Sequence, residues 1–332
     1  MRDHNLLGPW VRRFLLEYLV ADRNLARNTQ VSYRDTLTIL LPFVCQRAGV
    51  AIDRLSVLDI SPGIVRAFLE YLEHERSCSV VTRNQRLAAI RSLVRFIGAR
   101  SPEHLAWCAE VRSISFKKCT KRVIDYLDVP EMEALLRAPD QGTGIGVRDH
   151  ALLLFMYNSG ARAAEVAGLS IDNLQLGTSP SVRILGKGNK WRVCPLWPIT
   201  VSALRSLIAG RAHEDRVFLG RTGEPMTRFG VHRLVTAYAG IAGQQVESIQ
   251  SKRASPHNIR HTTAVHLLRS GVDINTIRAW LGHVSLDTTN IYAEVDLDMK
   301  AKALASVDIT NLPAAVITQS SLPSLMEFMR SL

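Results

Sequence analysis

Apolar residues recur every three or four positions through the first hundred residues of the chain, a spacing that places them on one face of an α-helix. The first clear run begins with Asn28 and Thr29, which are residues that can start a helix. The apolar positions on one side of this run are Tyr33, Leu37, Leu40, Leu41 and Val44. The pattern therefore predicts a helix for this segment.

Two further runs in the same region carry signals for the ends of helices. Ser61 is followed by Pro62, and a capping serine with proline in the first helical position is a typical helix start. A third run extends over about 80–97, with its apolar residues at helical spacing, and ends at Gly98. We therefore predict that residues 1–100 form an all-helical domain.

The helical pattern breaks between residues 99 and 122. Ser101-Pro102 interrupts it, and the segment that follows is crowded with basic residues: Arg112, Lys117, Lys118, Lys121 and Arg122. A free linker has no need of such a density of positive charge. We predict that residues 101–122 form a basic interdomain linker that lies close to an anionic partner.

A helical pattern returns at Asp128, which forms a capping-box-like start with Glu131 three residues later. The last helix of this region is bracketed by Asp273 as its cap and Gly282 as its stop. Between them, the spacing of apolar residues predicts helices over about 129–138, 147–159, 162–168, 198–209, 227–240, 256–270 and 274–281.

Two short stretches of the same region alternate between apolar and polar residues instead. They are Ser181–Leu185 and Trp191–Pro195, and they flank the turn sequence Gly-Lys-Gly-Asn. The predicted fold is therefore mainly α: an all-helical N-terminal domain, then a mainly α domain over residues 123–305 with a small antiparallel β-sheet. Residues 306–332 form a C-terminal tail.

Composition narrows the class of partner. The 332-residue chain has a net charge of +11, which suits a polyanion such as DNA, although charge alone favours nucleic acid only modestly. The five cysteines stand far apart with no C-x-x-C pair, and no secretory leader is present, so we expect reduced thiols and a cytoplasmic protein. The longest apolar runs, such as Ala151–Tyr157, are too short to cross a bilayer, so we expect no membrane partner.

Six residues in chain order suggest the chemistry. Two arginines can grip the oxygens of one phosphodiester, a lysine and two histidines can move or hold protons, and a tyrosine can attack phosphorus. They are Arg162, Lys187, His257, Arg260, His283 and Tyr292. No cluster of carboxylates accompanies them, so we expect phosphoryl transfer through a phosphotyrosine, with no metal and no cofactor.

Three stretches that contain these residues resemble the tyrosine recombinases, the phage integrase family. HNIRHTTAVHLLRSGVDINTIRAWLGHVSLDTTNIYAEV, over 257–295, resembles the C-terminal signature of the family. SGARAAEVAGL, over 159–169, resembles its first-arginine box, and ILGKGNKWRVCPL, over 184–196, resembles its lysine hairpin. The resemblance extends from about residue 8 to residue 305, and its specificity lies in the combination of the boxes.

The resemblance implies a role for each of these residues. Tyr292 is the nucleophile, and His257 helps to remove its proton. The charge on the phosphate is stabilised by Arg162, Arg260 and His283. Lys187 protonates the departing 5′ oxygen, with Lys190 as the less favoured alternative on the same turn. Glu165 lies three residues after Arg162 and can orient its guanidinium. His261 and His266 fall outside the motif and are expected either to pack or to support the site residues from behind.

The resemblance also implies a core-binding, SAM-like N-terminal domain that clamps DNA. The predicted helix over 80–97 carries four arginines that, as a set, favour contacts with phosphates or base edges, although each alone could belong to a solvated face. They are Arg83, Arg86, Arg91 and Arg95. Four basic residues of the predicted linker are assigned to the same DNA surface: Lys117, Lys118, Lys121 and Arg122.

We therefore interpret the chain as a site-specific recombinase of double-stranded DNA. By the resemblance, four copies hold two duplexes at inverted-repeat sites and exchange strands through a Holliday junction, in the cytoplasm and associated with the nucleoid. A type IB topoisomerase or a catalytically inactive DNA-binding protein are the alternatives. The early start of the helical domain favours a simple recombinase, such as that of a mobile element, over the large phage integrases. The tail is expected to dock into a neighbouring copy, with docking onto its own domain as the alternative.

Overall fold

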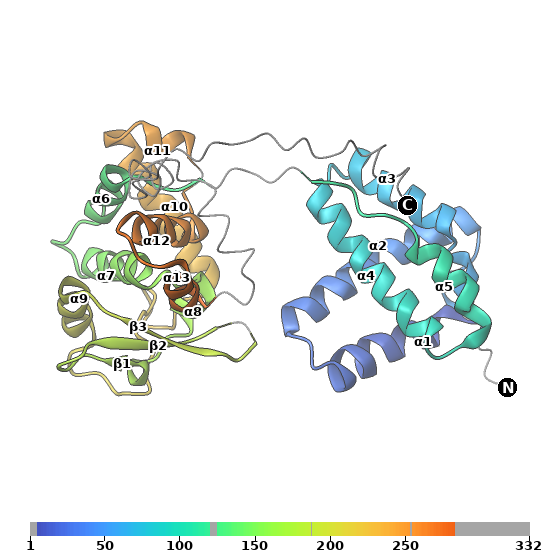
Figure 1. The fold of residues 1–332 in the computed structure, drawn as a ribbon, viewed down its shortest axis with the longest axis horizontal. Coiled ribbons are helices and arrows are strands. Elements are labelled where there is room, and N and C mark those ends of the chain that lie inside the picture. The colour runs from blue at the N-terminus through green and yellow to red at the C-terminus, as the bar shows by residue number, and fades with distance from the viewer. Residues whose placement is uncertain (1–4, 120–124, 187, 253, 283–332) are drawn as a thin grey trace, which may run out of the picture. The chain divides into compact units, whose positions relative to one another are not determined.

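The computed structural model describes residues 5–119, 125–186, 188–252 and 254–282 (Figure 1). The chain divides into two compact units, Met1–Arg122 and Val123–Leu332, and each is described by itself. Among the described residues, no helix combines the length and the apolar composition that a membrane span requires.

The N-terminal unit is built from helices. A π-helical segment, Phe14–Asp22, continues the first helix, and short 3₁₀ turns cover Ile52–Arg54, Val57–Asp59 and Pro102–His104. The α-helices are α1 (Leu7–Arg13), α2 (Arg27–Ala48), α3 (Pro62–His74), α4 (Val80–Gly98) and α5 (Leu105–Arg112).

The three helices predicted from the sequence of this unit are confirmed as α2, α3 and α4. The side chain of Ser61 accepts a hydrogen bond from the backbone N–H of Ile64 at the start of α3, as a capping residue does. The inward residues of α2, including Leu37, Leu40 and Val44, are buried in one core with those of α3 and α4. The period of the apolar residues therefore located both the helices and their buried faces.

The structure differs from the prediction between residues 105 and 112, which form helix α5. Trp107 and Val111 of this helix are buried in the N-terminal core, and the Trp107 indole donates to the carbonyl of Ile60 over 2.9 Å. A Cβ atom on Gly98 would lie 2.6 Å from the Sγ of Cys108, so glycine allows α4 and α5 to pack closely. The first half of the predicted linker is thus part of the N-terminal unit.

The C-terminal unit combines helices with one three-stranded sheet. The sheet has the order β1 (Leu174–Gln175), β2 (Ser181–Leu185) and β3 (Trp191–Pro195), and both pairs are antiparallel. The helices are α6 (Val129–Arg137), α7 (Gly144–Ser159), α8 (Ala163–Ala167), α9 (Pro198–Ile208), α10 (Arg228–Gln245), α11 (Ser248–Ser251), α12 (Pro256–Arg269) and α13 (Ile274–Leu281).

The predicted mainly α fold with a small antiparallel sheet is confirmed. The two predicted strands agree with β2 and β3 at both ends, while the two-residue β1 and the four-residue α11 were not predicted. The predicted caps are also present. The carboxylate of Asp273 accepts from the N–H groups of Asn275 and Thr276, and Gly282 ends α13 with a φ of +65°.

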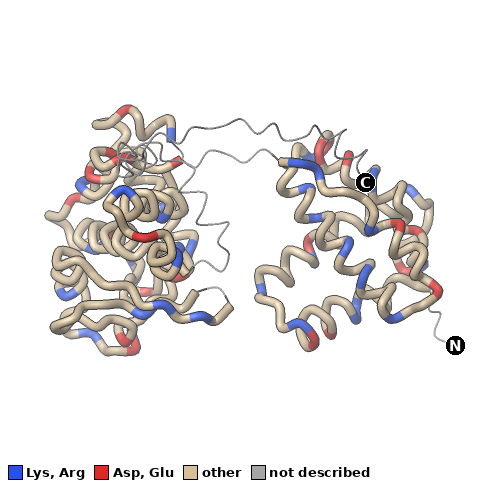
Figure 2. The backbone as a smooth tube through the Cα atoms, viewed as in Figure 1, with Lys and Arg blue, Asp and Glu red and all other residues tan. Residues whose placement is uncertain are grey.

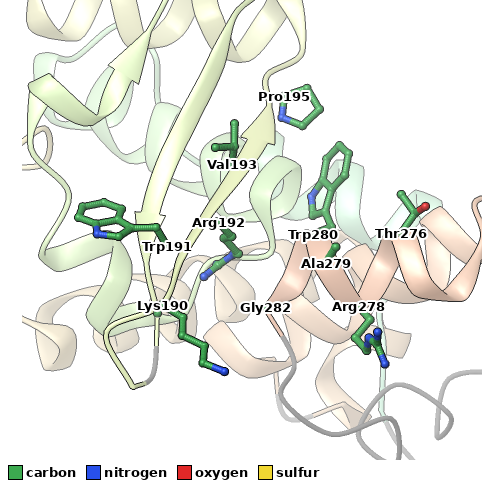
Figure 3. Close-up of a pocket in the computed structure, with 11 residues that line it drawn as sticks. Lys190, Trp191, Arg192, Val193, Pro195, Thr276, Arg278, Ala279, Trp280 and Gly282 are labelled. Atoms are coloured by element: carbon green, nitrogen blue, oxygen red, sulfur yellow. The ribbon is translucent and has the colours of Figure 1, made fainter.

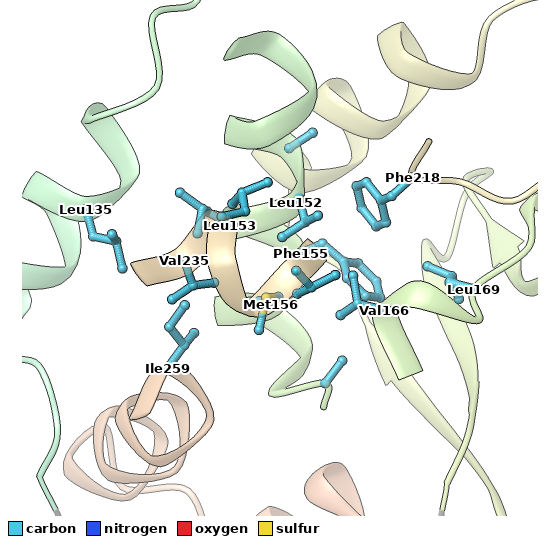
Figure 4. Close-up of a cluster of buried hydrophobic side chains, with 14 of the residues drawn as sticks. Leu135, Leu152, Leu153, Phe155, Met156, Val166, Leu169, Phe218, Val235 and Ile259 are labelled. Atoms are coloured by element: carbon cyan, nitrogen blue, oxygen red, sulfur yellow. The ribbon is translucent and has the colours of Figure 1, made fainter. Parts of the chain in front are cut away.

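Helix α7 lies at the centre of the C-terminal core (Figure 4). Its residues 151–156 are all buried, so this helix is apolar on every side. Leu152, Phe155 and Met156 pack in one cluster with residues of α8, α10 and α12, among them Val235 and Ile259. Burial of each such side chain contributes about 1.5–3 kcal/mol, so α7 is the element on which the others are positioned.

Candidate active site

The C-terminal end of α7 places the first candidate residue. The helix ends at Gly160, whose φ of +59° lies in the left-handed region that favours glycine. A Cβ atom at this position would lie 2.4 Å from the Cδ2 of Leu281, so glycine is also needed for the close approach of α13. Two residues later the chain is extended at Arg162, immediately before α8.

Glu165 binds Arg162 as expected from their spacing. Its Oε2 accepts from the Arg162 backbone N–H at 2.8 Å, and its Oε1 accepts from the Arg162 Nη1 at 2.7 Å. Its Oε2 also accepts from the Nη2 of Arg192 on β3, at 2.7 Å. Burial alone would raise the pKa of the Glu165 carboxyl, but the hydrogen bond and charge of Arg192, followed by those of Arg162, lower this pKa below its ordinary value.

Arg260 lies on α12, which begins after Ser255 with Pro256 in its first position, as predicted. Its side chain is 1% exposed. Its Nη1 donates to the carbonyl of Gly160 at 2.7 Å, and its Nη2 donates to the carbonyl of Leu281 at 2.6 Å. The guanidinium therefore joins α12 to the C-terminal ends of α7 and α13.

His257 lies in the first turn of α12. Burial, followed by the charges of Arg260 and Arg162, lowers the pKa of this imidazole below its ordinary value. The ring of His261 lies 4.2 Å from it between centroids, and burial with the charges of His257 and Arg260 lowers the pKa of His261 to about 4. Both imidazoles are therefore neutral near pH 7, and a neutral imidazole can accept a proton.

The other histidine of this helix, His266, makes the packing contact expected of it. Its Nδ1 and the hydroxyl of Tyr157 are 2.7 Å apart, and the two rings meet edge to face. This hydrogen bond joins α12 to α7.

Arg162, His257 and Arg260 line one pocket of about 540 Å³, which we name the arginine pocket. The complete lining is Arg162, Ala163, Ala164, Arg228, Phe229, His232, Ser255, Pro256, His257 and Arg260. The start of α10 contributes Arg228 and His232 to this lining, and neither residue was predicted from the sequence. Their only local signal is their place in the first turns of a helix that is capped by Thr227.

Three of the six candidate catalytic residues, Lys187, His283 and Tyr292, lie outside the described residues. The hairpin that contains position 187 has Gly188 and Asn189 with φ values of +75° and +55°. Lys190, the alternative to Lys187, is exposed and lines a second pocket of about 760 Å³ (Figure 3). We name this the hairpin pocket; β3, its turn and α13 contribute the lining residues Gly186, Lys190, Trp191, Arg192, Val193, Pro195, Thr276, Arg278, Ala279, Trp280 and Gly282.

Figure 2 marks where Lys and Arg positions lie along the backbone. The arginines predicted to face DNA differ in the surroundings of their side chains. Arg83 is buried, and its Nη1 donates to the Asn84 side chain and to the carbonyl of Ser115. This burial does not fit the prediction that Arg83 contacts phosphates or base edges together with the other arginines of α4. Position 83 lies four residues before Leu87 and thus on the buried face of α4, where the arginine holds the chain that follows α5.

The remaining arginines of α4 are more accessible. Arg95 is exposed, while Arg86 and Arg91 are half-buried, the latter with its guanidinium 4.9 Å from the centre of the Phe116 ring. Lys117 and Lys118 are exposed, and Lys117 pairs with Glu73. Lys121 and Arg122 lie outside the described residues.

Within the described ranges, no group of three or more histidine, cysteine, aspartate or glutamate side chains is placed to hold a metal ion.

The chain matches two family descriptions along most of its length. Residues 125–298 match the phage integrase family, and residues 12–101 match the phage integrase N-terminal SAM-like domain. The match to the phage integrase family includes all six candidate catalytic positions.

Relatives similar in sequence to this chain are named as tyrosine recombinases. The chain is 32% identical to the tyrosine recombinase XerC of Pelobacter propionicus, with 87% of this chain and 91% of the relative covered. It is also 32% identical to the tyrosine recombinase XerD of Vibrio cholerae, with 84% and 90% covered.

Solved structures share the fold. The Tn1549 transposon integrase, in complex with circular intermediate DNA, matches with a TM-score of 0.66 at 17% identity, covering 89% of this chain and 99% of the integrase chain. The XerH site-specific recombinase bound to its difH substrate matches with a TM-score of 0.64 at 20% identity, covering 88% and 83%. The chain belongs to the phage integrase family of tyrosine recombinases.

Proposed function

We propose that this chain is a site-specific DNA recombinase that cuts and rejoins strands through a 3′-phosphotyrosine intermediate. The observation that carries the proposal is the arginine pocket, in which Arg162, His257 and Arg260 line one cavity from two different elements. Two guanidinium groups and a neutral imidazole around one cavity fit a phosphodiester that is to be attacked.

In the proposed cleavage step, the two arginines neutralise the non-bridging oxygens of the scissile phosphate, with His283 as a further donor. Glu165 occupies the Nη1 of Arg162, and because 36% of the Arg162 side chain is exposed, the rest of its guanidinium can meet the phosphate. Arg260 lines the same pocket, and its bonds to the carbonyls of Gly160 and Leu281 hold its guanidinium in place there. Charge that develops in the transition state therefore meets fixed donors.

The proton transfers follow from the same residues. The Tyr292 oxygen forms a bond to phosphorus while the bond to the 5′ oxygen breaks. His257, neutral because of its lowered pKa, accepts the proton of the tyrosine hydroxyl, and Lys187 donates a proton to the departing oxygen. A 5′ hydroxyl of another strand then reverses the step, and the phosphotyrosine conserves the energy of the broken phosphodiester.

The choice of DNA as substrate is supported by charge and by family. The net charge is +11, and the N-terminal unit matches the SAM-like domain that accompanies integrases. We propose that a DNA surface is formed by Arg86, Arg91, Arg95, Lys117, Lys118, Lys121 and Arg122. Arg83 is left out of this surface because it is buried.

The proposed assembly is a tetramer that holds two duplexes at inverted-repeat sites and exchanges strands through a Holliday junction. The names of the relatives, which are XerC and XerD recombinases, support this choice over simple relaxation of DNA. We propose a cytoplasmic, nucleoid-associated protein. The tail over residues 306–332, proposed to dock into a neighbouring copy, lies outside the described residues.

Suicide substrates with a nick beside the scissile phosphate test the proposal. Inverted repeats from the DNA that flanks the gene supply the candidate sites. The wild type should form a covalent protein–DNA adduct only on duplexes that contain its site, and should resolve synthetic Holliday junctions there. Site-independent relaxation of supercoiled DNA would identify a topoisomerase instead, and specific binding without an adduct would identify an inactive binding protein.

A further inference from the structure

We propose that Arg192 on β3 is a positioning residue that fixes the phosphate-binding Arg162 through the carboxylate of Glu165. The inference rests on the proposed function of the arginine pocket. It adds to that function a buried residue that does not line the arginine pocket and whose position in the chain is separated from Glu165 by 27 residues.

The geometry is that of one carboxylate held between two arginines. Arg162 approaches Glu165 from the side of the arginine pocket, and Arg192 approaches from the sheet. All three hydrogen bonds to the carboxylate measure 2.7–2.8 Å, and both of its oxygens are occupied. Because a carboxylate fixed at three points cannot rotate freely, the guanidinium that it binds is fixed as well.

Burial distinguishes the two arginines. The side chains of Glu165 and Arg192 are each 6% exposed, whereas that of Arg162 is 36% exposed. A carboxylate this buried needs a counter-ion inside the protein, since taking an unpaired charge out of water is costly. Arg192 supplies that counter-ion, so Glu165 stays neutralised when Arg162 also binds a phosphate.

Two glycines make room for Arg192. A Cβ atom on Gly282 would lie 3.1 Å from the Arg192 Cδ, and one on Gly186 would lie 3.4 Å from its Nη1. Figure 3 shows Arg192 between β3 and α13, beside Gly282. In the sequence, Gly186 immediately precedes Lys187 and Gly282 immediately precedes His283. The side chain thus packs where the chain leads into two other candidate catalytic positions.

The fold itself satisfies Arg192 only partly. Its Nε and Nη1 are buried, and neither has a hydrogen-bond partner among the residues that the structure describes. Buried donors without partners reduce stability, so a residue present for stability alone would be expected to have them filled. Its Nη2 does have a partner, and the bond that this atom makes to Glu165 is the bond that the positioning role requires.

The test compares single-turnover cleavage of a suicide substrate by Arg192→Met, Arg192→Lys and the matched control Arg183→Met. Arg183 is an exposed arginine on β2 that stacks over Trp191, so its replacement removes the same charge from the same hairpin without reaching Glu165. Arg192→Met should slow cleavage about 10- to 100-fold, the range for residues that orient others in a site. Arg192→Lys should recover part of the rate, and Arg183→Met should cleave DNA at the wild-type rate once bound.

A double-mutant cycle separates positioning from a general structural effect. In the Glu165→Gln background, Arg192→Met should slow cleavage by no more than about twofold, because the path through Glu165 is already broken. Half-site binding and thermal melting are measured for every variant. If Arg192→Met melts early, the comparison uses Arg192→Lys in the same two backgrounds.

Cleavage by Arg192→Met at the wild-type rate, or rate losses that multiply in the double mutant, would overturn the proposal. No adduct with the wild type would instead contradict the proposed function. The two failures are distinguishable because every Arg192 result is expressed relative to wild-type cleavage.

Discussion

Replacement of Arg260 by alanine should damage both the fold and the chemistry, and the two losses can be measured separately. The side chain is 1% exposed and donates to the carbonyls of Gly160 and Leu281 at 2.7 and 2.6 Å. Each hydrogen bond to a charged group contributes about 1.5–3 kcal/mol, so the loss of both corresponds to about 3–6 kcal/mol. Water that enters from the adjoining arginine pocket can replace part of these hydrogen bonds, so we expect the free energy of unfolding to fall by about 3 kcal/mol.

Arg162→Ala is the matched control, since it removes the other arginine of the same pocket. Its side chain is 36% exposed, and Glu165 keeps Arg192 as a partner when Arg162 is lost. The expected loss of stability is therefore at most about 1 kcal/mol, the range for exposed ion pairs. Both variants should lose about 10³-fold or more in cleavage, the scale for removing an arginine that stabilises a transferring phosphoryl group.

Urea unfolding and thermal melting of the full-length chain measure the first effect, and suicide-substrate cleavage measures the second. For a unit of this size, about 3 kcal/mol corresponds to a fall in Tm of roughly 6–12 °C. If Arg260→Ala were as stable as the wild type, its carbonyl bonds would not stabilise the fold. If it were more stable than Arg162→Ala, burial would not determine how much each arginine contributes to the stability of the fold.

Three further predictions concern pH, salt and metal. His261 has an ordinary pKa of 6.5 in the unfolded chain and a pKa of about 4 in the folded chain, so between pH 7 and pH 5 only the unfolded chain gains this proton. The free energy of unfolding should therefore fall by about 1–2 kcal/mol as the pH is lowered from 7 to 5. Urea midpoints that stay level in this window would contradict the burial of this ring. Affinity for a half-site should fall steeply with salt as counterions are released, and Arg95→Gln should lower the slope of log affinity against log salt by about one unit; an unchanged slope would remove Arg95 from the DNA surface. Cleavage should continue in EDTA, because Arg162 and Arg260 supply the positive charge at the phosphate, and a strict need for magnesium in the cleavage step would overturn that mechanism.

Much of the fold could be predicted from local patterns in the sequence. Strands β2 and β3 were located because apolar and polar residues alternate on both sides of a glycine-containing turn. The helix starts at Ser61, Asp128 and Ser255 could be predicted because each capping residue is hydrogen-bonded to the residue three positions later. Such signals are local, so a single sequence carries them.

The errors occurred where the deciding contacts lie far apart in the sequence. Helix α5 has only eight residues, too few for a clear helical period, and it is stabilised by the packing of its apolar residues in the N-terminal core. Arg83 was predicted to contact DNA together with the other arginines of its helix, although its spacing of four residues from Leu87 places it on the buried face of α4. The helical period, and not the positive charge, determines where the Arg83 side chain lies.

In the candidate site, too, contacts between residues close in sequence could be predicted, and contacts between distant elements could not. The contact between Arg162 and Glu165 follows from a spacing of three residues, and the structure contains it. Arg192 and Arg228 approach the same region from β3 and α10, and no periodicity connects these positions. Their contribution becomes visible only when the elements are packed together.

The most direct test of the central claim is to identify the atom that joins protein to DNA. The trapped adduct would be digested with nuclease and trypsin, and the modified peptide sequenced by tandem mass spectrometry. We predict a nucleotide attached through its 3′ phosphate to Tyr292, and no adduct from Tyr292→Phe although that variant still binds the site. A nucleotide on another residue, a 5′ linkage, or an adduct formed by Tyr292→Phe would contradict the account.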